Sequence, residues 1–343
     1  MLLQEERTGR QNNFNLIRIY LSLSVVFFHS YELSQQEELS FLNSLFNADR
    51  AVQAFFIISG YLVMKSYQQS SSLKDFLIKR VRRIYPAYFI VIVVCAIAGA
   101  LVTTYPVARY FLSAELYRYL FSNLCFLNFI QPSLPGVFTG NFLTAVNGSL
   151  WTLKIEVAYY LFVPVIVLFR TKTNVHLLYA ILFLGSLGYL ATMKYLSVSH
   201  QNNTWLFLSR QLPGELFYFI LGAWVLELQK ERWFPVVLRW IGLPCMLLLF
   251  LPLSFVIQSL LTAIVVFFLA YAIPVINYPA KEQDISYGIY IVHFPVIQVL
   301  VYYQLYSYSV FTSLLLTLAI TIILALISWL YIEKTFMAKK ITP

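Results

Sequence analysis

Long apolar runs that recur along the whole chain constrain its fold more than any other feature. Runs of 17 to 23 mostly apolar residues repeat through the 343-residue sequence, and a helix needs about 20 such residues to cross a bilayer. Hydrophobic residues make up 60% of the chain and charged residues only 11%, far from the composition of soluble domains. Because backbone polar groups in lipid must be paired internally, we predict an all-α integral membrane protein.

A hydropathy window of about 20 residues gives a bundle of about ten transmembrane helices. The sequence shows no internal repeat and no linker, so we expect a single transmembrane domain over residues 1–343, without an appended soluble domain. Arg7 and Arg10 precede the first apolar run, but no small-x-small cleavage site follows it, so we expect an uncleaved helix. The candidate spans lie near residues 14–31, 51–67, 84–104, 148–169, 175–195, 205–228, 240–256, 257–276, 285–307 and 309–332.

The distribution of basic residues predicts the topology. With the N-terminus in the cytoplasm, 17 of the 24 lysines and arginines fall in inside segments, as the positive-inside rule requires. Both termini are therefore expected in the cytoplasm. The net charge of +9 then reflects loop charge, and we expect no nucleic-acid partner.

Two further features limit the architecture. Residues 105–147 form a long outer connection whose apolar piece, 116–130, is short and contains Arg118, so we expect a re-entrant or interfacial element there. The three cysteines, Cys95, Cys125 and Cys245, lack metal-like spacing, and we expect neither a disulfide framework nor a metal site.

Two ionisable residues, Arg18 and His29, lie inside the first apolar run. Eleven helical positions correspond to about 1100°, so both side chains project from one face, about 16 Å apart along the axis. Ionisable groups within membrane helices usually face a polar interior or a pathway. We therefore treat both as candidate site residues, although Arg18 is close enough to the cytoplasmic end to reach the headgroups.

A basic cluster lies between the second and third spans, at Lys79, Arg80, Arg82 and Arg83, followed by Tyr85 and a proline. One interpretation is a charged flank that sets topology, followed by a helix that starts near Pro86. The other is an anion site, because guanidinium groups present planar donor forks that suit phosphate.

Six short motifs follow one another in a characteristic order, and together they cover nearly the whole chain. They resemble those of membrane acyltransferase family 3, whose members O-acylate carbohydrates of bacterial cell surfaces and some other acceptors. The motifs are Arg18-x10-His29, Phe-Phe-Ile-Ile-Ser-Gly-Tyr-Leu at 55–62, Arg-Val-Arg-Arg-Ile-Tyr-Pro at 80–86, Trp-Thr-Leu-Lys-Ile-Glu at 151–156, Ser-Tyr-Gly-Ile-Tyr-Ile-Val-His at 286–293 and Ile-Glu-Lys at 332–334.

The chain departs from the family pattern at several positions. Gln53 stands where many members have an acid, Thr152 replaces a serine, Val157 replaces a second acid, and Lys154 is unusual within its motif. None of these departures affects Arg18, His29 or the Arg80 and Arg83 pair.

The resemblance implies an acyl-CoA-dependent O-acyltransferase of the bacterial inner membrane, with acetyl-CoA as the expected co-substrate and no metal. Its acceptor would be a sugar hydroxyl of a surface polysaccharide, such as an exopolysaccharide or O-antigen, or of a lipid-linked precursor, met in the lipid bilayer. A hydroxyl needs activation at neutral pH, and imidazole suits a general base, while an acyl-histidine nucleophile is the competing mechanism. The expected catalytic residues are His29, Arg18 and Glu156, the expected donor-binding residues are Arg80, Arg82, Arg83 and Tyr85, and further candidates are Ser59, Trp151, Tyr287 and His293.

Two other classes of protein remain open from the sequence. A transporter or flippase would use Arg18, His29 and Glu156 to line a glycan path without covalent chemistry. A non-catalytic partner in glycan assembly is the third alternative. The basic cluster favours the enzyme, because a flippase has no need of a CoA phosphate site. His176 and His200 lie at loop edges and are expected to be solvated.

Overall fold

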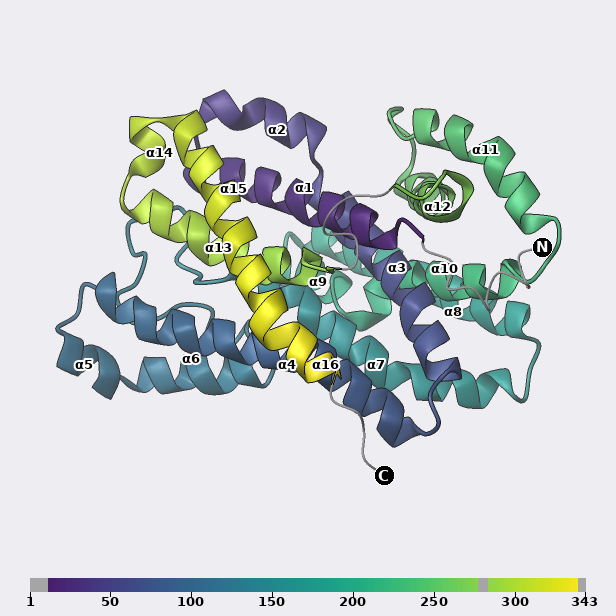
Figure 1. Cartoon of the computed structure of the whole chain (residues 1–343), viewed down its shortest axis with the longest axis horizontal. Coiled ribbons are helices and arrows are strands. Elements are labelled where there is room, and N and C mark those ends of the chain that lie inside the picture. Colours follow the sequence, from purple (N-terminus) through teal and green to yellow (C-terminus); the bar gives the residue numbers. More distant parts are fainter. Residues whose placement is uncertain (1–11, 277–282, 339–343) are drawn as a thin grey trace. The chain divides into compact units, whose positions relative to one another are not determined.

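The computed structural model describes residues 12–276 and 283–338, and these are almost entirely helical (Figure 1). Within these ranges no β-strand forms, apart from one isolated bridge between Thr103 and Val137. In chain order the α-helices are α1 (Phe14–Ser34), α2 (Ser40–Leu45), α3 (Ala48–Gln68), α4 (Leu73–Ala98), α5 (Val107–Leu112), α6 (Ala114–Leu124), α7 (Trp151–Arg170), α8 (Val175–His200), α9 (Asn203–Ser209), α10 (Leu212–Leu228), α11 (Phe234–Leu248), α12 (Phe255–Phe267), α13 (Ser286–Tyr302), α14 (Leu305–Tyr308), α15 (Val310–Ile327) and α16 (Lys334–Ala338). Short 3₁₀ segments are η2 (Glu37–Leu39), η3 (Gly99–Leu101) and η4 (Gly148–Leu150), and π-helical turns are η5 (Phe268–Ala272) and η6 (Ser328–Glu333).

Six helical segments of the described chain are long and apolar enough to cross a membrane. They contain α1, α4, α7, α8, α12 and α15. The other four expected spans correspond to α3, α10, α11 and α13, of which α11 and α13 are shorter apolar helices. All-helical architecture is thus confirmed, whereas the count of ten spans is not, and the orientation of the termini stays a prediction.

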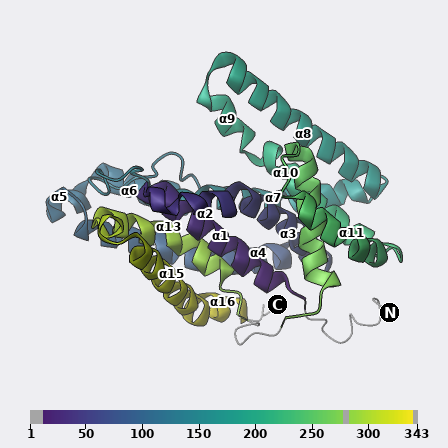
Figure 2. The same ribbon diagram turned by 90° about the horizontal axis from the view of Figure 1, so that it is seen from above.

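The helices form two compact units, each assembled from three separate stretches of chain. The first lies within residues 1–21, 52–69 and 158–283, and the second within 22–51, 70–157 and 284–343. In the first unit α9 and α10 pack along α8, and α11 packs against α12 (Figure 2). In the second unit α13 packs against α15, and α4 contacts α6, α13, η6 and α16.

Helix α4 begins thirteen residues before Pro86, so the predicted start near that proline is wrong. Ser72 caps the helix by accepting a hydrogen bond from the backbone N–H of Asp75 (3.1 Å), the usual contribution of a serine at this position. Pro86 lies inside the helix and contributes no backbone N–H. The basic cluster is therefore part of α4, and its side chains point to different sides of one helix.

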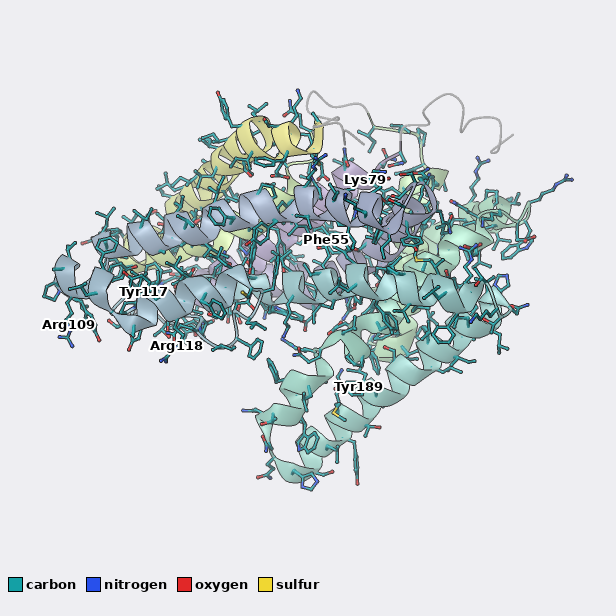
Figure 3. The ribbon with its side chains drawn as sticks, turned by 90° about the horizontal axis from the view of Figure 1, so that it is seen from below. Phe55, Lys79, Arg109, Tyr117, Arg118 and Tyr189 are labelled. Carbon is teal, nitrogen blue, oxygen red and sulfur yellow. The ribbon has the colours of Figure 1, made fainter. Side chains whose placement is uncertain are left out.

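The outer connection contains two short helices, α5 and α6. Helix α6 has 11 residues, so at 1.5 Å per residue it is too short to cross the bilayer. Leu116 and Tyr119 of α6 are buried within the second unit. The hydroxyl of Tyr88 on α4 donates a hydrogen bond to the backbone carbonyl of Asn123 (2.7 Å). Arg109, Tyr117 and Arg118 are exposed and project outward (Figure 3). This region does not span, and its re-entrant or interfacial placement stays a prediction.

The boundary between the expected spans 240–256 and 257–276 lies earlier in the chain. Helix α11 ends at Leu248 and α12 begins at Phe255, so Pro252 falls in the connection, where a missing N–H costs no helical hydrogen bond. The span expected near 205–228 is likewise divided into α9 and α10, with Pro213 in the first turn of α10.

Two glycines let α3 and α10 approach backbone to backbone in the first unit. A Cβ atom on Gly60 would overlap the carbonyl oxygen of Phe219, and one on Gly222 would overlap that of Ile57. Small residues at such crossings allow close helix packing in membranes. The glycine of the Phe-Phe-Ile-Ile-Ser-Gly motif thus has a packing role.

Replacing Gly60 with alanine is expected to destabilise the protein by about 1–3 kcal/mol, because the overlapping atoms are backbone and the helices must separate. Unfolding in detergent measures the change. Gly188→Ala in α8 is the control, since no heavy atom lies within 4 Å of the added Cβ, and alanine is the better helix former. Equal stability of both variants would contradict the packing role.

Candidate active site

The second unit brings together two histidines that are 264 residues apart in the sequence. His29 Nδ1 on α1 lies 2.9 Å from His293 Nε2 on α13. The two ring planes are nearly parallel, inclined by 12°, and the ring centroids are 5.2 Å apart. We call His29 and His293 the histidine pair. His293 is fully buried, whereas the His29 side chain keeps 16% of its surface exposed.

Both outer nitrogens of the pair also have neighbours. His293 Nδ1 lies 3.2 Å from the carbonyl oxygen of Ile289, one helical turn earlier on α13. His29 Nε2 lies 3.5 Å from Glu32 Oε2, one turn later on α1. The arrangement is a line of polar groups that starts at a buried backbone carbonyl and ends at a carboxylate.

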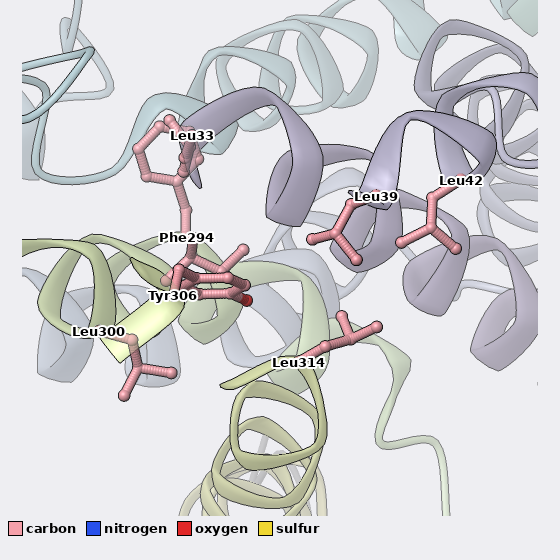
Figure 4. Packing of buried hydrophobic residues seen from close by; sticks show 8 residues of the cluster. Leu33, Leu39, Leu42, Phe294, Leu300, Tyr306 and Leu314 are labelled. Carbon is pink, nitrogen blue, oxygen red and sulfur yellow. The ribbon is translucent and has the colours of Figure 1, made fainter. Parts of the chain in front are cut away.

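An apolar cluster adjoins the histidine pair. Phe294 contacts the His29 ring edge-on, with centroids 5.2 Å apart. The hydroxyl of Tyr306 lies 2.7 Å from Thr317 Oγ1. The buried members of the cluster, drawn in Figure 4, are Leu33, Leu39, Leu42, Phe294, Ile297, Leu300, Tyr306 and Leu314.

The start of α7 packs against α13 through polar side chains. Thr152 Oγ1 and Tyr290 Oη are 2.8 Å apart, and Tyr290 also reaches the carbonyl oxygen of Ser149 (3.2 Å). Glu156 lies one turn beyond Thr152 on the same face of α7, close enough to interact electrostatically with Tyr290 and Tyr287. The predicted site residue Glu156 therefore neighbours the tyrosines of α13, while His293 contacts Nδ1 of His29 and Glu32 lies 3.5 Å from Nε2.

A proline in α13 explains one of these connections. Pro295 has no backbone N–H, so the carbonyl of Ile291 four residues earlier lacks its helical donor. Asn147 Nδ2 donates to that carbonyl instead (2.8 Å), and Asn147 Oδ1 accepts from Ser149 (2.7 Å). This bond holds the segment before α7 against the helix that contains His293.

The other end of α13 carries a buried ion-pair cluster. Arg83 donates to Asp284 Oδ2 (2.5 Å) and to Glu333 Oε2 (3.1 Å). Ser286 and Ser328 bond the second oxygens of these carboxylates, at 2.6 and 2.9 Å. We call Arg83, Asp284 and Glu333 the Arg83 cluster. Both amino groups of Arg83 thus contact protein carboxylates, and the cluster joins α4 and η6 to the segment just before α13.

The remaining residues predicted to bind the acyl donor also lie on α4. Arg80 is half-buried, with its guanidinium 6.0 Å from the ring centre of Phe76, and Arg82 is half-buried too. Tyr85 is 37% exposed and lies beside Phe126, with ring centroids 6.2 Å apart. Tyr287, a further candidate, donates from its hydroxyl to the carbonyl of Ile84 (2.8 Å) and so fixes this turn of α4 to α13.

Three other predicted residues occupy different surroundings. Arg18 is half-buried on the part of α1 that belongs to the first unit, eleven positions before His29. Ser59 Oγ, next to Gly60 on α3, is buried without a hydrogen-bond partner among the described residues. Trp151 is half-buried as the first residue of α7.

Several site residues escaped the sequence analysis. Glu32 stands three positions after His29, a spacing that brings helical side chains together, and this was a readable signal. Asn147 and Asp284 lie outside helices and gave no such signal, since their partners are distant in sequence. The described residues contain no group of three or more His, Cys, Asp or Glu that could hold a metal ion.

The fold and the site define a multi-pass, helical membrane protein with a polar, histidine-centred site among apolar helices. The chain belongs to acyltransferase family 3: the family's sequence profile, described as an acyltransferase domain, matches residues 11–333. It is therefore a membrane acyltransferase.

Two relatives match over most of their lengths. An O-acetyl transferase of Shigella phage Sf6 is 29% identical over 96% of this chain and 97% of its own. Nodulation protein 10 of Rhizobium leguminosarum bv. viciae is 28% identical over 87% of this chain and 86% of its own. No solved structure matches the chain significantly.

Proposed function

We propose that this protein is an O-acyltransferase of the bacterial inner membrane. It moves an acyl group, in the first instance acetyl, from cytosolic acyl-CoA to a sugar hydroxyl of a surface polysaccharide or its lipid-linked precursor. The observation that carries the proposal is the 2.9 Å contact between His29 and His293 among apolar helices. The name of the phage relative, an O-acetyl transferase, supports the acetyl group and the oxygen acceptor.

His29 performs the chemistry in this proposal. As a general base it takes the proton of the acceptor hydroxyl while the oxygen attacks the thioester carbon. The new C–O bond forms as the C–S bond breaks, and the departing CoA thiolate receives the proton from His29. As a nucleophile, His29 would instead accept the acyl group first and pass it on. Arg18 and Glu156 complete the proposed catalytic set, with Glu156 beside Tyr290 positioned to bind sugar hydroxyls.

Arg80, Arg82 and Tyr85 bind the acyl donor in this proposal. Guanidinium groups bind phosphates through paired hydrogen bonds, and the nucleotide end of CoA carries several phosphates. Arg83 contributes by a different route, because its amino groups contact Asp284 and Glu333. It anchors the turn of α4 that presents its two neighbours.

Arg80→Ala and Arg82→Ala are each expected to raise the KM for acetyl-CoA by about 10- to 100-fold, the loss of a charge-assisted hydrogen bond. The same variants should leave the KM for acetyl-pantetheine unchanged, because that donor lacks the nucleotide phosphates. Lys79→Ala is the matched control on the same helix, since Lys79 is exposed and pairs with Asp75. Equal effects on both donors would contradict phosphate binding.

The class of protein is tested with the purified protein and with inverted vesicles, incubated with acetyl-labelled CoA and a glycan acceptor. The enzyme releases CoA and labels the glycan. A transporter or flippase, the second candidate, would move glycan across the vesicle membrane without consuming any acyl-CoA. That outcome would overturn the proposal.

A further inference from the structure

We propose that His293 is a positioning residue that fixes the tautomer of His29, so that Nε2 of His29 is the reacting atom and Glu32 faces it. This inference rests on the proposed role of His29 in acyl transfer. It is carried by three contacts in line, from Ile289 to His293, from His293 to His29 and from His29 to Glu32.

The direction of the hydrogen bonds follows from the first contact. A backbone carbonyl oxygen only accepts hydrogen bonds, so His293 Nδ1 carries the proton that it donates to Ile289. His293 is fully buried among apolar helices, where a charged imidazolium is disfavoured, so its Nε2 carries a lone pair. That lone pair accepts the hydrogen bond from His29, and the proton of neutral His29 is therefore on Nδ1.

The tautomer leaves the lone pair of His29 on Nε2. This is the form that takes a proton from a hydroxyl or attacks a thioester, whereas a proton on Nε2 would block both reactions. His293 therefore determines which nitrogen of His29 reacts, although His293 contacts neither the acyl donor nor the acceptor in this proposal.

Glu32 occupies the other end of the line. Its Oε2 atom is 3.5 Å from His29 Nε2, which is longer than a direct hydrogen bond. The carboxylate therefore does not block the lone pair on His29 Nε2. When Nε2 gains a proton or an acyl group, the ring becomes positively charged and the neighbouring carboxylate stabilises it. Glu32 is part-exposed, at 38% of its side chain.

The surroundings of His293 keep the line in place. The Tyr290 ring lies 5.9 Å from the His293 ring, and Tyr290 is itself bonded to Thr152. Asn147 holds the carbonyl of Ile291 on the same helix. His293 is thus set in a packed helix that α7 and its preceding segment support.

The assignment is tested first by nitrogen-15 NMR of histidine-labelled protein in detergent. The wild type is expected to show a protonated Nδ1 and an unprotonated Nε2 for His29, assigned by loss of its signals in His29→Gln. In His293→Leu the fixed tautomer is expected to be lost. A protonated Nε2 in neutral His29 of the wild type would overturn the inference, and a purely structural role for His293 would not predict the change.

Activity gives the second test. His293→Leu is expected to lower kcat by about 10²- to 10⁴-fold, the range for a general base that is lost or held in the wrong tautomer, with the KM for acetyl-CoA unchanged. His293→Gln should recover much of the loss, because its amide oxygen can accept from His29 Nδ1. The control is Thr317→Val, which removes a hydrogen bond of Tyr306 in the adjoining cluster without touching His29.

The two proposals fail in different ways. If the wild type transfers no acyl group from acyl-CoA, the proposed function is wrong, and if His29→Ala transfers acyl groups normally, the proposed catalytic role of His29 is wrong. If His29→Ala is inactive but His293→Leu retains full activity and the same tautomer, only the role of His293 is wrong.

Discussion

Replacement of His29 by alanine is expected to lower acyl transfer by about 10²- to 10⁴-fold, the usual contribution of a positioned general base, or more if His29 is the nucleophile. In the proposed mechanism the hydroxyl proton or the acyl group passes through His29, whose Nδ1 lies 2.9 Å from His293 Nε2. The measurement is CoA release and label transfer from acetyl-labelled CoA. The folded variant should still bind the donor, because the proposed phosphate-binding residues Arg80 and Arg82 lie on α4 and not on α1.

Two variants separate chemistry from packing. His29→Gln keeps an amide N–H for His293 but offers no base, so it should be as inactive as alanine while folding like the wild type. His176→Ala removes another histidine, one that accepts from Trp224 in the first unit (3.0 Å), and should retain activity. Full transfer by His29→Gln would exclude His29 from the reaction.

Replacement of Arg83 by alanine is expected to destabilise the protein by about 3–5 kcal/mol, the cost of removing one partner from a buried ionic cluster. The variant leaves Asp284, 8% exposed, and Glu333, 1% exposed, without the cation that faces both. Urea unfolding or thermal denaturation in detergent measures the loss. Glu333→Gln should cost less than Arg83→Ala, because it removes a buried charge and leaves Arg83 paired with Asp284.

The control for this prediction is Lys79→Ala on the same helix. Lys79 and Asp75 form an exposed ion pair, and exposed pairs add little stability, so no measurable change is expected. The same experiment decides between two roles for Arg83. A variant as stable as the wild type with a raised KM for acyl-CoA would place Arg83 among the phosphate ligands and contradict its anchoring role.

The helices were predictable because hydropathy is local. The apolar runs near 14–31, 148–169 and 175–195 correspond to α1, α7 and α8. The start of α4 could not be predicted from hydropathy, because residues 73–83 are rich in charge and give no apolar signal. Its helix is set by a serine cap and by the contacts of Arg83 with two other segments.

The sequence by itself determined the class of architecture, the family and the position of His29. These depend on composition, on the eleven-residue spacing along one helix and on motif order, all of which can be read from neighbouring residues. The tertiary structure alone decided which groups meet: His29 with His293, Arg83 with Asp284 and Glu333, and Asn147 with the carbonyl that Pro295 leaves open. The physical reason is that a hydrogen bond or ion pair depends on atoms brought within about 3 Å, and residues 144 to 264 positions apart reach that distance only through the packing of whole helices.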